Sequence, residues 1–302
     1  MSLGVLNNIS AIYAENNLNQ TNASLQNTLT QLSSGSRINS GADDAAGLSL
    51  ADGLGANAAA LTQSATNASS GVGLLQVADG ALSQVTNLLN RAVTLATESS
   101  NGTLNSTQDA AANQEFQSIL AEINNIGSTT TYNGQAVFGN ATATNIYTGD
   151  GTTAGGSIDA LTISALASGT VGDANGTLTY TAAAGGVPAT ISYATGTQAN
   201  LSADTLSTAT ASQTALTDVT NAITDVAAQR GYLGSQINTL NAAAGVESTE
   251  QTNVVSAQNS IMATDYGQAT SNLSKFQILS QTGISALAQA NTVQQEVLKL
   301  LQ

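Results

Sequence analysis

The chain has 302 residues and a net charge of −14, from 5 Lys and Arg against 19 Asp and Glu, and it contains neither Cys nor His. Nucleic acids and anionic membrane surfaces are bound through clusters of Lys and Arg, so neither is expected as a partner. The lack of Cys and His excludes disulfides, metal sites built on these residues, and His-based acid–base catalysis.

Apolar residues make up 41% of the chain, but aromatic residues make up only 3% and there is no Trp. Helices with such thin apolar stripes are stabilised best when several of them share one seam. We therefore expect packing between copies of the chain rather than one large core within a single copy.

Residues 3–32 are predicted to form an amphipathic helix with a narrow apolar face, and the small polar residues and Gly at 33–36 end it. The first ten residues carry no positive charge and no long apolar run, so they predict neither a cleavable signal peptide nor a transmembrane helix. If the chain leaves the cell, another export route must carry it. The apolar face consists of Leu18, Leu25, Leu29 and Leu32.

A long helix is predicted next, with Ser40 and Asp43 matching a capping box and with Asp43 and Asp44 in the first turn. Its apolar residues recur at alternating steps of four and three, as in the seam of a coiled coil. The phase continues past Asp79, which either fixes register or faces solvent, and gives a helix of about 45 residues. The seam consists of Leu54, Ala58, Leu61, Ala65, Ala68, Val72, Leu75, Leu82, Leu89 and Ala96.

Ser106 and Asp109 are predicted to cap a third helix, and Asn133-Gly134 predicts a tight turn between short strands, because this dipeptide readily adopts positive φ. From 139 to 200 the composition shifts to Gly and Thr, and alternating residues at 178–180 and 191–193 predict β-strands with one buried face. The density of Ser and Thr from 139 to 215 is consistent with an O-glycosylated surface or with a plain Thr-rich β surface. The third helix carries Phe116, Ile119, Ile123 and Ile126 on one face.

Helix is predicted to return from Leu201 to about Asp265, with a second seam at Leu216, Val219, Ile223, Val226, Arg230, Leu233, Ile237 and Leu240. At its seam position, Arg230 is expected to form a structural ion pair with a carboxylate such as Glu98 or Glu115. Gly267 and its polar neighbours are predicted to hinge a last amphipathic helix. That helix carries Leu273, Phe276, Ile284, Leu287, Val297, Leu298 and Leu301. Neither seam can stay exposed to water, so the two ends of the chain are expected to pair.

Five blocks of the sequence resemble, in the same order, blocks of the bacterial flagellins. The segment LSSGSRINSGADDAAGLSL at 32–50 resembles the N-terminal signature of that family, and the others lie at 71–82, 131–138, 260–279 and 286–301. Together they span both ends of the chain and leave the middle unmatched, as expected for a family that varies most in its middle. Where flagellins commonly have Ala-Lys, this chain has Gly41-Ala42, so Asp43 and Asp44 are expected to rely on backbone amides or on Arg37.

The periodicity and the resemblance together predict a mainly α fold, with long antiparallel coiled-coil helices from both termini and a small β-rich central insert. Residues 1–43 with 263–302 are expected to form the inner core of a filament, and 44–138 with 201–262 a helical coiled-coil domain. Residues 139–200 are expected to form a variable insert exposed on the filament surface.

The resemblance implies a structural subunit, exported unfolded through the flagellar type III apparatus, that polymerises into the extracellular filament used for swimming. It implies terminal segments that are disordered in the monomer and ordered in the polymer. Its partners would be many copies of itself, the export apparatus and its chaperone, and the filament cap and junction proteins, with no cofactor. The expected assembly interface comprises Leu18, Leu25, Leu29, Leu32, Arg37, Asp43, Asp44, Leu273, Phe276, Ile284, Leu287, Leu298 and Leu301.

A Toll-like receptor recognises flagellins, and Arg91, Leu95 and Glu115 align with its usual contacts. A second Arg and a Glu of that motif are replaced here by Val93 and Thr94, so weak signalling is expected.

Two alternative functions remain open from the sequence. A hook–filament junction protein shares flagellin-like ends, and a secreted adhesin would act through the insert. An enzyme is disfavoured, because no acid–base set converges. Asp43 and Asp44 are not a catalytic pair, since adjacent helical positions point about 100° apart.

Overall fold

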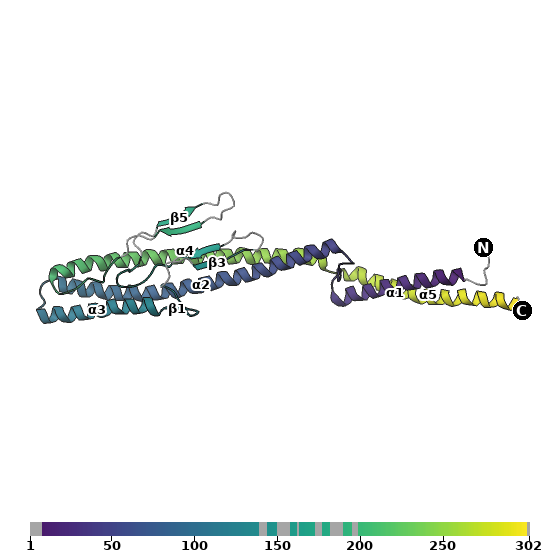
Figure 1. The fold of residues 1–302 in the computed structure, drawn as a ribbon, viewed down its shortest axis with the longest axis horizontal. Helices are drawn as coiled ribbons and strands as arrows, with labels where there is room; N and C mark the ends of the chain where they lie inside the picture. The colour runs from purple at the N-terminus through teal and green to yellow at the C-terminus, as the bar shows by residue number, and fades with distance from the viewer. Residues whose placement is uncertain are drawn as a thin grey trace. The chain divides into compact units, whose positions relative to one another are not determined.

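The computed structural model describes residues 8–138, 144–149, 158–161, 163–172, 177–181, 190–194 and 199–300 (Figure 1). It divides into two compact units, described separately below. The terminal unit is Met1–Ala56 with Asn253–Gln302, and the central unit is Asn57–Thr252. In the described ranges no helix is both long and apolar enough to cross a membrane.

In the terminal unit, helices α1 (Ile9–Ser34) and α5 (Tyr266–Leu300) lie side by side and run antiparallel (Figure 1). The Asn8 side chain caps α1 by accepting a hydrogen bond from the amide of Ala11 at 3.0 Å. Gly35 ends the same helix in the left-handed conformation, with φ of 71°, so the predicted break at 33–36 is confirmed.

Helix α2 (Ala45–Ser100) begins later than the capping box predicted. Asp44 caps it, because its Oδ1 accepts a hydrogen bond from the amide of Gly47 at 2.8 Å. Asp43 lies in the turn before the helix, where its carboxylate accepts hydrogen bonds from the amide and the hydroxyl of Ser40 at 2.9 and 3.1 Å. Since the Ser40 hydroxyl donates to Asp43, it does not cap the helix, and the prediction was wrong.

The break before α5 also lies slightly earlier than predicted. Helix α4 (Ala209–Met262) ends at Met262, and Asp265 caps α5 by accepting a hydrogen bond from the amide of Gln268 at 3.1 Å. Gly267 is inside α5 rather than at the break, so the hinge was predicted a few residues too late.

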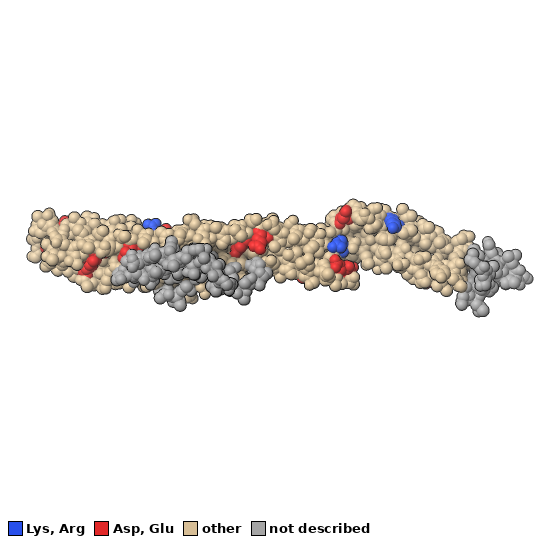
Figure 2. Space-filling model, turned by 90° about the horizontal axis from the view of Figure 1, so that it is seen from above, with Lys and Arg blue, Asp and Glu red and all other residues tan. Residues whose placement is uncertain are grey.

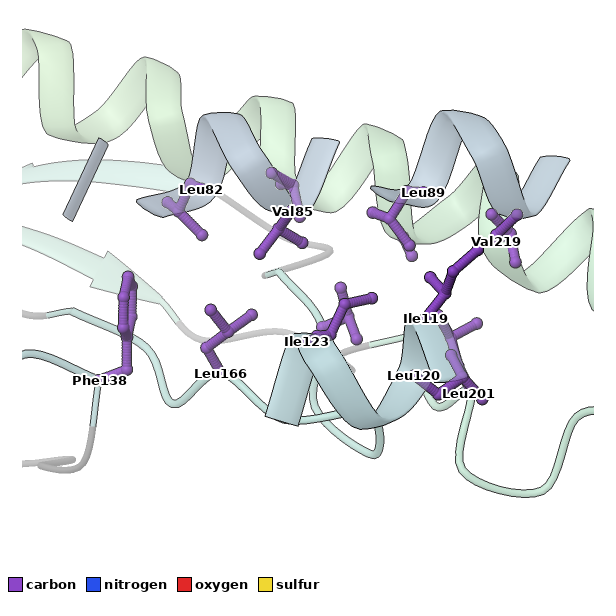
Figure 3. Close-up of a cluster of buried hydrophobic side chains, with 14 of the residues drawn as sticks. Leu82, Val85, Leu89, Ile119, Leu120, Ile123, Phe138, Leu166, Leu201 and Val219 are labelled. Atoms are coloured by element: carbon purple, nitrogen blue, oxygen red, sulfur yellow. The ribbon is translucent and has the colours of Figure 1, made fainter. Parts of the chain in front are cut away.

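The core of the structure lies in the central unit, between α2, α4 and α3 (Ser106–Thr129). Both predicted seams point into it, with Leu75, Leu82 and Leu89 of α2 and Val219 and Leu233 of α4 fully buried. The predicted seams are therefore confirmed, although α2 has 56 residues, more than the expected length. Figure 3 shows the apolar side chains of α2 and α3 packing against one another; the labelled ones include Leu82, Val85, Leu89, Ile119 and Ile123.

The cap of α3 is Asn105 rather than Ser106. The Asn105 side chain and the N3 residue Gln108 form a complete capping box. Asp109 instead accepts a hydrogen bond from the Ser99 hydroxyl at 2.9 Å, which ties the start of α3 to the end of α2. Asn is as good a cap as Ser, so the sequence could not separate two adjacent candidates.

Short antiparallel hairpins follow α3. Strands β1 (Thr131–Tyr132) and β2 (Gln135–Ala136) are joined by Asn133 and Gly134 at φ of 50° and 75°, so the predicted turn is confirmed. Strand β3 (Thr144–Tyr147) pairs with β4 (Ile158–Leu161), and β5 (Thr177–Thr181) pairs with β6 (Thr190–Ala194). The predicted strands at 178–180 and 191–193 are therefore present, whereas their predicted buried face falls on side chains outside the described set. The structure is mainly α with a small β-rich insert, as the sequence predicted.

Candidate assembly surface

The contact between α1 and α5 is built largely from small side chains. A Cβ atom placed on Gly283 of α5 would meet Leu18 of α1 at 3.2 Å, so the two helices approach closely at this point. The half-buried and buried positions of α1 include Ala11, Ala14, Leu18, Thr21, Ser24, Leu25 and Thr28. Those of α5 include Ala269, Asn272, Leu273, Phe276, Ser280, Gly283, Leu287 and Ala290.

Most of the large apolar side chains of the two helices face away from this contact. Besides Tyr266 at the first position of α5, seven of them are 43% to 67% exposed: Ile9, Ile12, Tyr13 and Leu29 of α1, and Ile278, Leu279 and Ile284 of α5. Ile9, Ile12 and Tyr13 are neighbours on one helical face, since they are three and four residues apart. We call these seven side chains the outward apolar set. A concentration of exposed large apolar side chains marks an interaction surface.

The terminal unit has almost no core of its own. Its buried apolar side chains, among the described residues, are Ile38, Ala51 and Ala269, whereas the large buried cluster lies entirely in the central unit. Helices with little tertiary packing are marginal in water. The terminal unit therefore needs a partner surface more than the central unit does.

The structure divides the predicted assembly residues into groups. Leu18, Leu25, Leu32, Leu273, Phe276 and Leu287 are half-buried, whereas Leu29 and Ile284 point outward. The side chain of Leu298 and the whole of Leu301 lie outside the described set.

Sequence reasoning missed Ile9, Ile12, Tyr13, Ile278 and Leu279, because it followed one apolar stripe along each helix. The missed signal was that apolar residues occupy more than one face of these helices. A helix with two apolar faces needs two partners.

The turn between α1 and α2 is held within the chain. Hydrogen bonds from the amides of Asn39 and Ser40 lower the pKa of the Asp43 carboxyl, because they favour its charged form. Arg37 is directed elsewhere: its guanidinium Nη2 donates to the carbonyl of Ile261 at 2.9 Å. Of the two supports proposed for Asp43, the structure shows the backbone amides.

Arg91 of α2 and Glu115 of α3 form a bidentate ion pair on the surface. The Nε–Oε1 distance is 2.6 Å and the Nη2–Oε2 distance is 2.9 Å. The hydrogen bonds between the two side chains, and then their opposite charges, raise the pKa of Arg91 and lower the pKa of Glu115. Leu95, the third residue aligned with the receptor motif, is 3% exposed and belongs to the core.

Arg230 forms the predicted structural ion pair, but with a different partner. Its Nε lies 2.7 Å from Oδ1 of Asp79, whereas Glu115 is taken by Arg91. The prediction of Glu98 or Glu115 was therefore wrong. Arg230 and Asp79 each interrupt a different seam, and their pairing depends on how the two helices are aligned.

One carboxyl group of the central unit has a strongly shifted pKa. Burial, and then the nearby charge and hydrogen bonding of Asp218, raise the pKa of Asp204 to about 6. Asp204 lies in the segment that returns the chain from the insert to α4, and Gln117 of α3 donates to its carbonyl at 2.7 Å. The segment is further anchored by Leu201 and Leu206, which are fully buried.

No catalytic or metal centre emerges from the part of the chain that the structure describes. No three His, Cys, Asp or Glu side chains gather there in a way that could hold an ion. An open groove of ≈ 410 Å³ between α2 and α4 is lined by uncharged residues, namely Leu61, Thr62, Ala65, Thr66, Ser69, Ser248 and Gln251. On the face shown in Figure 2, charged side chains are sparse and most of the described surface is uncharged.

Comparisons with known proteins match both ends of the chain. The family described as bacterial flagellin N-terminal helical region matches residues 5–143, and the bacterial flagellin C-terminal helical region matches residues 216–301. The flagellin of Listeria monocytogenes serovar 1/2a is 29% identical over 299 residues, which cover 97% of this chain and 98% of that protein. The flagellar filament 33 kDa core protein of Treponema phagedenis is 31% identical over 301 residues, covering 97% and 98%. Among solved structures, Bacillus cereus flagellin is similar with 24% identity, 60% of this chain and 88% of that chain covered, and a TM-score of 0.44.

Proposed function

The chain belongs to the bacterial flagellin family, and we propose that it assembles by burying its outward apolar set between neighbouring copies. It is a structural subunit of the extracellular flagellar filament, which bacteria use for swimming. The relatives named above are filament proteins, and nothing in them favours a junction protein or an adhesin.

The observation that carries the proposal is the contrast between the two units. The central unit buries a large apolar cluster, whereas the terminal unit buries few apolar side chains and exposes nine large ones, namely the outward apolar set with Leu50 and Tyr266. Completing the burial of one such half-exposed side chain is worth about 1 kcal/mol. Seven of them supply enough free energy to hold a marginal helix pair in an assembly.

The placement of the outward apolar set favours an open polymer over a closed oligomer. The set is divided between α1 and α5, which differ in sequence and run in opposite directions. A contact between the α1 face of one copy and the α5 face of the next joins two different surfaces. Such a head-to-tail contact leaves a free surface at each end, and more copies can add, wherever the rotation from one copy to the next does not close a ring.

Within this scheme the predicted assembly residues have two roles. The half-buried residues pair α1 with α5, and Leu29 and Ile284 join the outward apolar set. Arg37, Asp43 and Asp44 act within the chain by holding the turn and the start of α2.

We also propose the division of the subunit within the filament. Residues 1–43 with 263–302 form its inner core, 44–138 with 201–262 surround that core, and 139–200 face outward. The support is that exposed large apolar side chains are concentrated in the terminal helices. Positions in the interior of a polymer are those that bury such side chains.

The proposed partners beyond other copies are the flagellar export apparatus and its chaperone, and the filament cap and junction proteins. These follow from the family and not from a particular contact in this chain. Recognition by a Toll-like receptor is proposed to be weak, because the guanidinium of Arg91 is already engaged by both carboxylate oxygens of Glu115.

Terminal deletions test the assembly role. A chain lacking residues 1–40 or 263–302 should remain a soluble monomer with its central helices intact, and should form no filaments in electron micrographs. As a control, residues 173–198 can be replaced by a short Gly linker, since the Val171 amide donates to the Ala199 carbonyl at 3.1 Å and holds the two ends together. The control should still polymerise. Filaments from either terminal deletion would refute the proposal.

A further inference from the structure

A small clasp joins the end of α1 to the end of α4. Residues 35–37 run antiparallel to residues 262–264, with Ser36 opposite Ala263. The Arg37 amide donates to the Met262 carbonyl at 2.7 Å, and the Thr264 amide donates to the Gly35 carbonyl at 3.1 Å. All of these residues belong to the terminal unit.

Arg37 contributes the only charged side chain among the hydrogen bonds of this clasp. Helix α4 ends at Met262, so its last carbonyls have no partner within the helix. Arg37 satisfies two of them, Met262 with its amide and Ile261 with its guanidinium at 2.9 Å. A positive charge at the C-terminus of a helix is also favoured by the helix dipole.

The seam between α1 and α5 specifies its own register weakly. Large interlocking side chains and buried polar groups fix the register of helix pairs. In this seam small residues (Ala, Gly, Ser and Thr) are interspersed with the half-buried Leu18, Leu25, Leu32, Leu273, Phe276 and Leu287. Two polar contacts mark the observed register. Asn8 Nδ2 donates to the Ala290 carbonyl at 2.9 Å, and the Ser280 hydroxyl donates to Asn22 Oδ1 at 3.1 Å.

We propose that Arg37 is a positioning residue that sets the register between α1 and α5. It fixes the end of α4 against the chain leaving α1, and only three residues then separate α4 from α5. Both terminal helices therefore start from one fixed point and pair at matching distances from it. The inference rests on the proposed function in one respect. The register matters for assembly because it decides how the outward apolar residues of α1 are aligned with those of α5.

Engineered cysteine pairs can report the register directly, because the chain has no native Cys. Asn22→Cys with Ser280→Cys should form an intrachain disulfide in the observed register. Asn22→Cys with Leu273→Cys or with Leu287→Cys reports a slip of one heptad in either direction. Each pair is oxidised in the full-length chain under polymerising conditions, and the intrachain disulfide is measured by peptide mass mapping of the monomer band from a denaturing, non-reducing gel.

Replacing Arg37 should lower the disulfide yield of the in-register pair and raise that of the two slipped pairs. In an Arg37→Ala background the ratio of in-register to slipped disulfide should fall roughly fivefold, the scale of a cation at a helix C-terminus. Arg37→Lys, which keeps the charge, should restore part of the ratio, and Ser36→Ala, which removes a hydrogen bond of 3.2 Å to the Met262 carbonyl, should lower it. Arg91→Ala removes an Arg of the central unit and should leave the ratio unchanged.

This readout separates register from stability, because general loosening of the helix pair lowers all three disulfides together. An unchanged ratio in Arg37→Ala, or an equal loss from all three pairs, would overturn the inference. The proposed function would survive either result as long as the Arg37→Ala chain forms filaments, and it fails separately if the terminal deletions polymerise.

Discussion

Arg230 and Asp79 interrupt the two apolar seams of the central unit, and they do so at the same level, so that each is the partner of the other. The Arg230 Nε donates to Asp79 Oδ1 at 2.7 Å, and Nη2 donates to Oδ2 at 3.4 Å. Both side chains are about one-third exposed, 36% and 38%, so the pair lies at the edge of the core. A matched polar pair in a coiled-coil seam favours one register of the two helices over slipped ones.

The coupling between these two residues is measurable by a double-mutant cycle. Asp79→Ala, Arg230→Ala and the double variant should give a coupling free energy of about 0.5 kcal/mol, reduced from that of a buried pair by solvent screening. Urea unfolding of the central unit in the full-length chain measures it. The same cycle on Arg91 and Glu115, which are more exposed, should give a smaller coupling. Zero coupling at Arg230 would mean that the contact is only incidental.

The sequence predicted the seams well because their periodicity is a local property. Leu75 and Leu82 are buried as expected, since a 4–3 spacing places them on one face whatever the rest of the chain does. The partner of Arg230 could not be predicted in the same way. It depends on how two helices far apart in sequence are aligned, and several carboxylates were available.

Helix starts were predicted to within a few residues only, because adjacent polar residues compete for the same cap. Asp44 caps α2 where Ser40 was expected, and Asn105 caps α3 where Ser106 was expected. The capping hydrogen bonds depend on the conformation of each turn in the folded chain. The outward apolar set was missed for a different reason. A single-stripe search assigns one buried face to each helix, whereas α1 has a second apolar face at Ile9, Ile12 and Tyr13, and α5 carries Ile278, Leu279 and Ile284 outside its buried stripe.

The stability of the central unit should depend on pH through Asp204. Its folded pKa of about 6 lies above the ordinary value of 3.8, so folding favours the protonated form. The contribution of Asp204 to the free energy of unfolding is therefore fully present below about pH 4 and is lost as the pH rises through 6. With allowance for partial exposure, the loss between pH 4 and pH 7.5 should be about 1 kcal/mol.

Asp204→Asn tests this dependence, because it keeps the shape of the side chain and removes its charge. The variant should be more stable than the unaltered chain at pH 7.5 in urea unfolding, and should lack the loss between pH 4 and 7.5 that Asp204 causes. Asp218→Asn should remove only part of the dependence, since burial, the larger cause, remains. A pH profile unaltered by Asp204→Asn would show that this carboxyl is not the titrating group.

Two glycines within helices of the central unit should respond in opposite directions to the same substitution. A Cβ on Gly80 of α2 would meet nothing within 4 Å, so Gly80→Ala should raise the free energy of unfolding by about 0.5–1 kcal/mol. A Cβ on Gly127 of α3 would collide with the carbonyl oxygen of Leu166. Gly127→Ala should therefore lower the free energy of unfolding by about 1–3 kcal/mol. Equal effects in urea unfolding would contradict the packing of the insert against α3.

Polymerisation should be sensitive to single members of the outward apolar set. Ile12→Ser should raise the critical concentration for polymerisation roughly tenfold, because about 1.4 kcal/mol of apolar burial is lost for each added copy. Sedimentation of polymer at a series of chain concentrations measures it. Val246→Ser removes an apolar side chain from α4 of the central unit that is 65% exposed, against 51% for Ile12, and serves as the control. If both variants polymerise like the unaltered chain, the α1 face is not part of the contact.

Hydrogen exchange measured on the same chain, dilute and polymerised, tests most directly whether the terminal helices are stabilised by neighbouring copies. The amides of α1 and α5 should exchange much faster than those of the buried α2 and α4 segments in the dilute chain, and should become protected in the filament. If α1 and α5 were already as protected in the dilute chain as the central helices, burial between copies would not be what stabilises them.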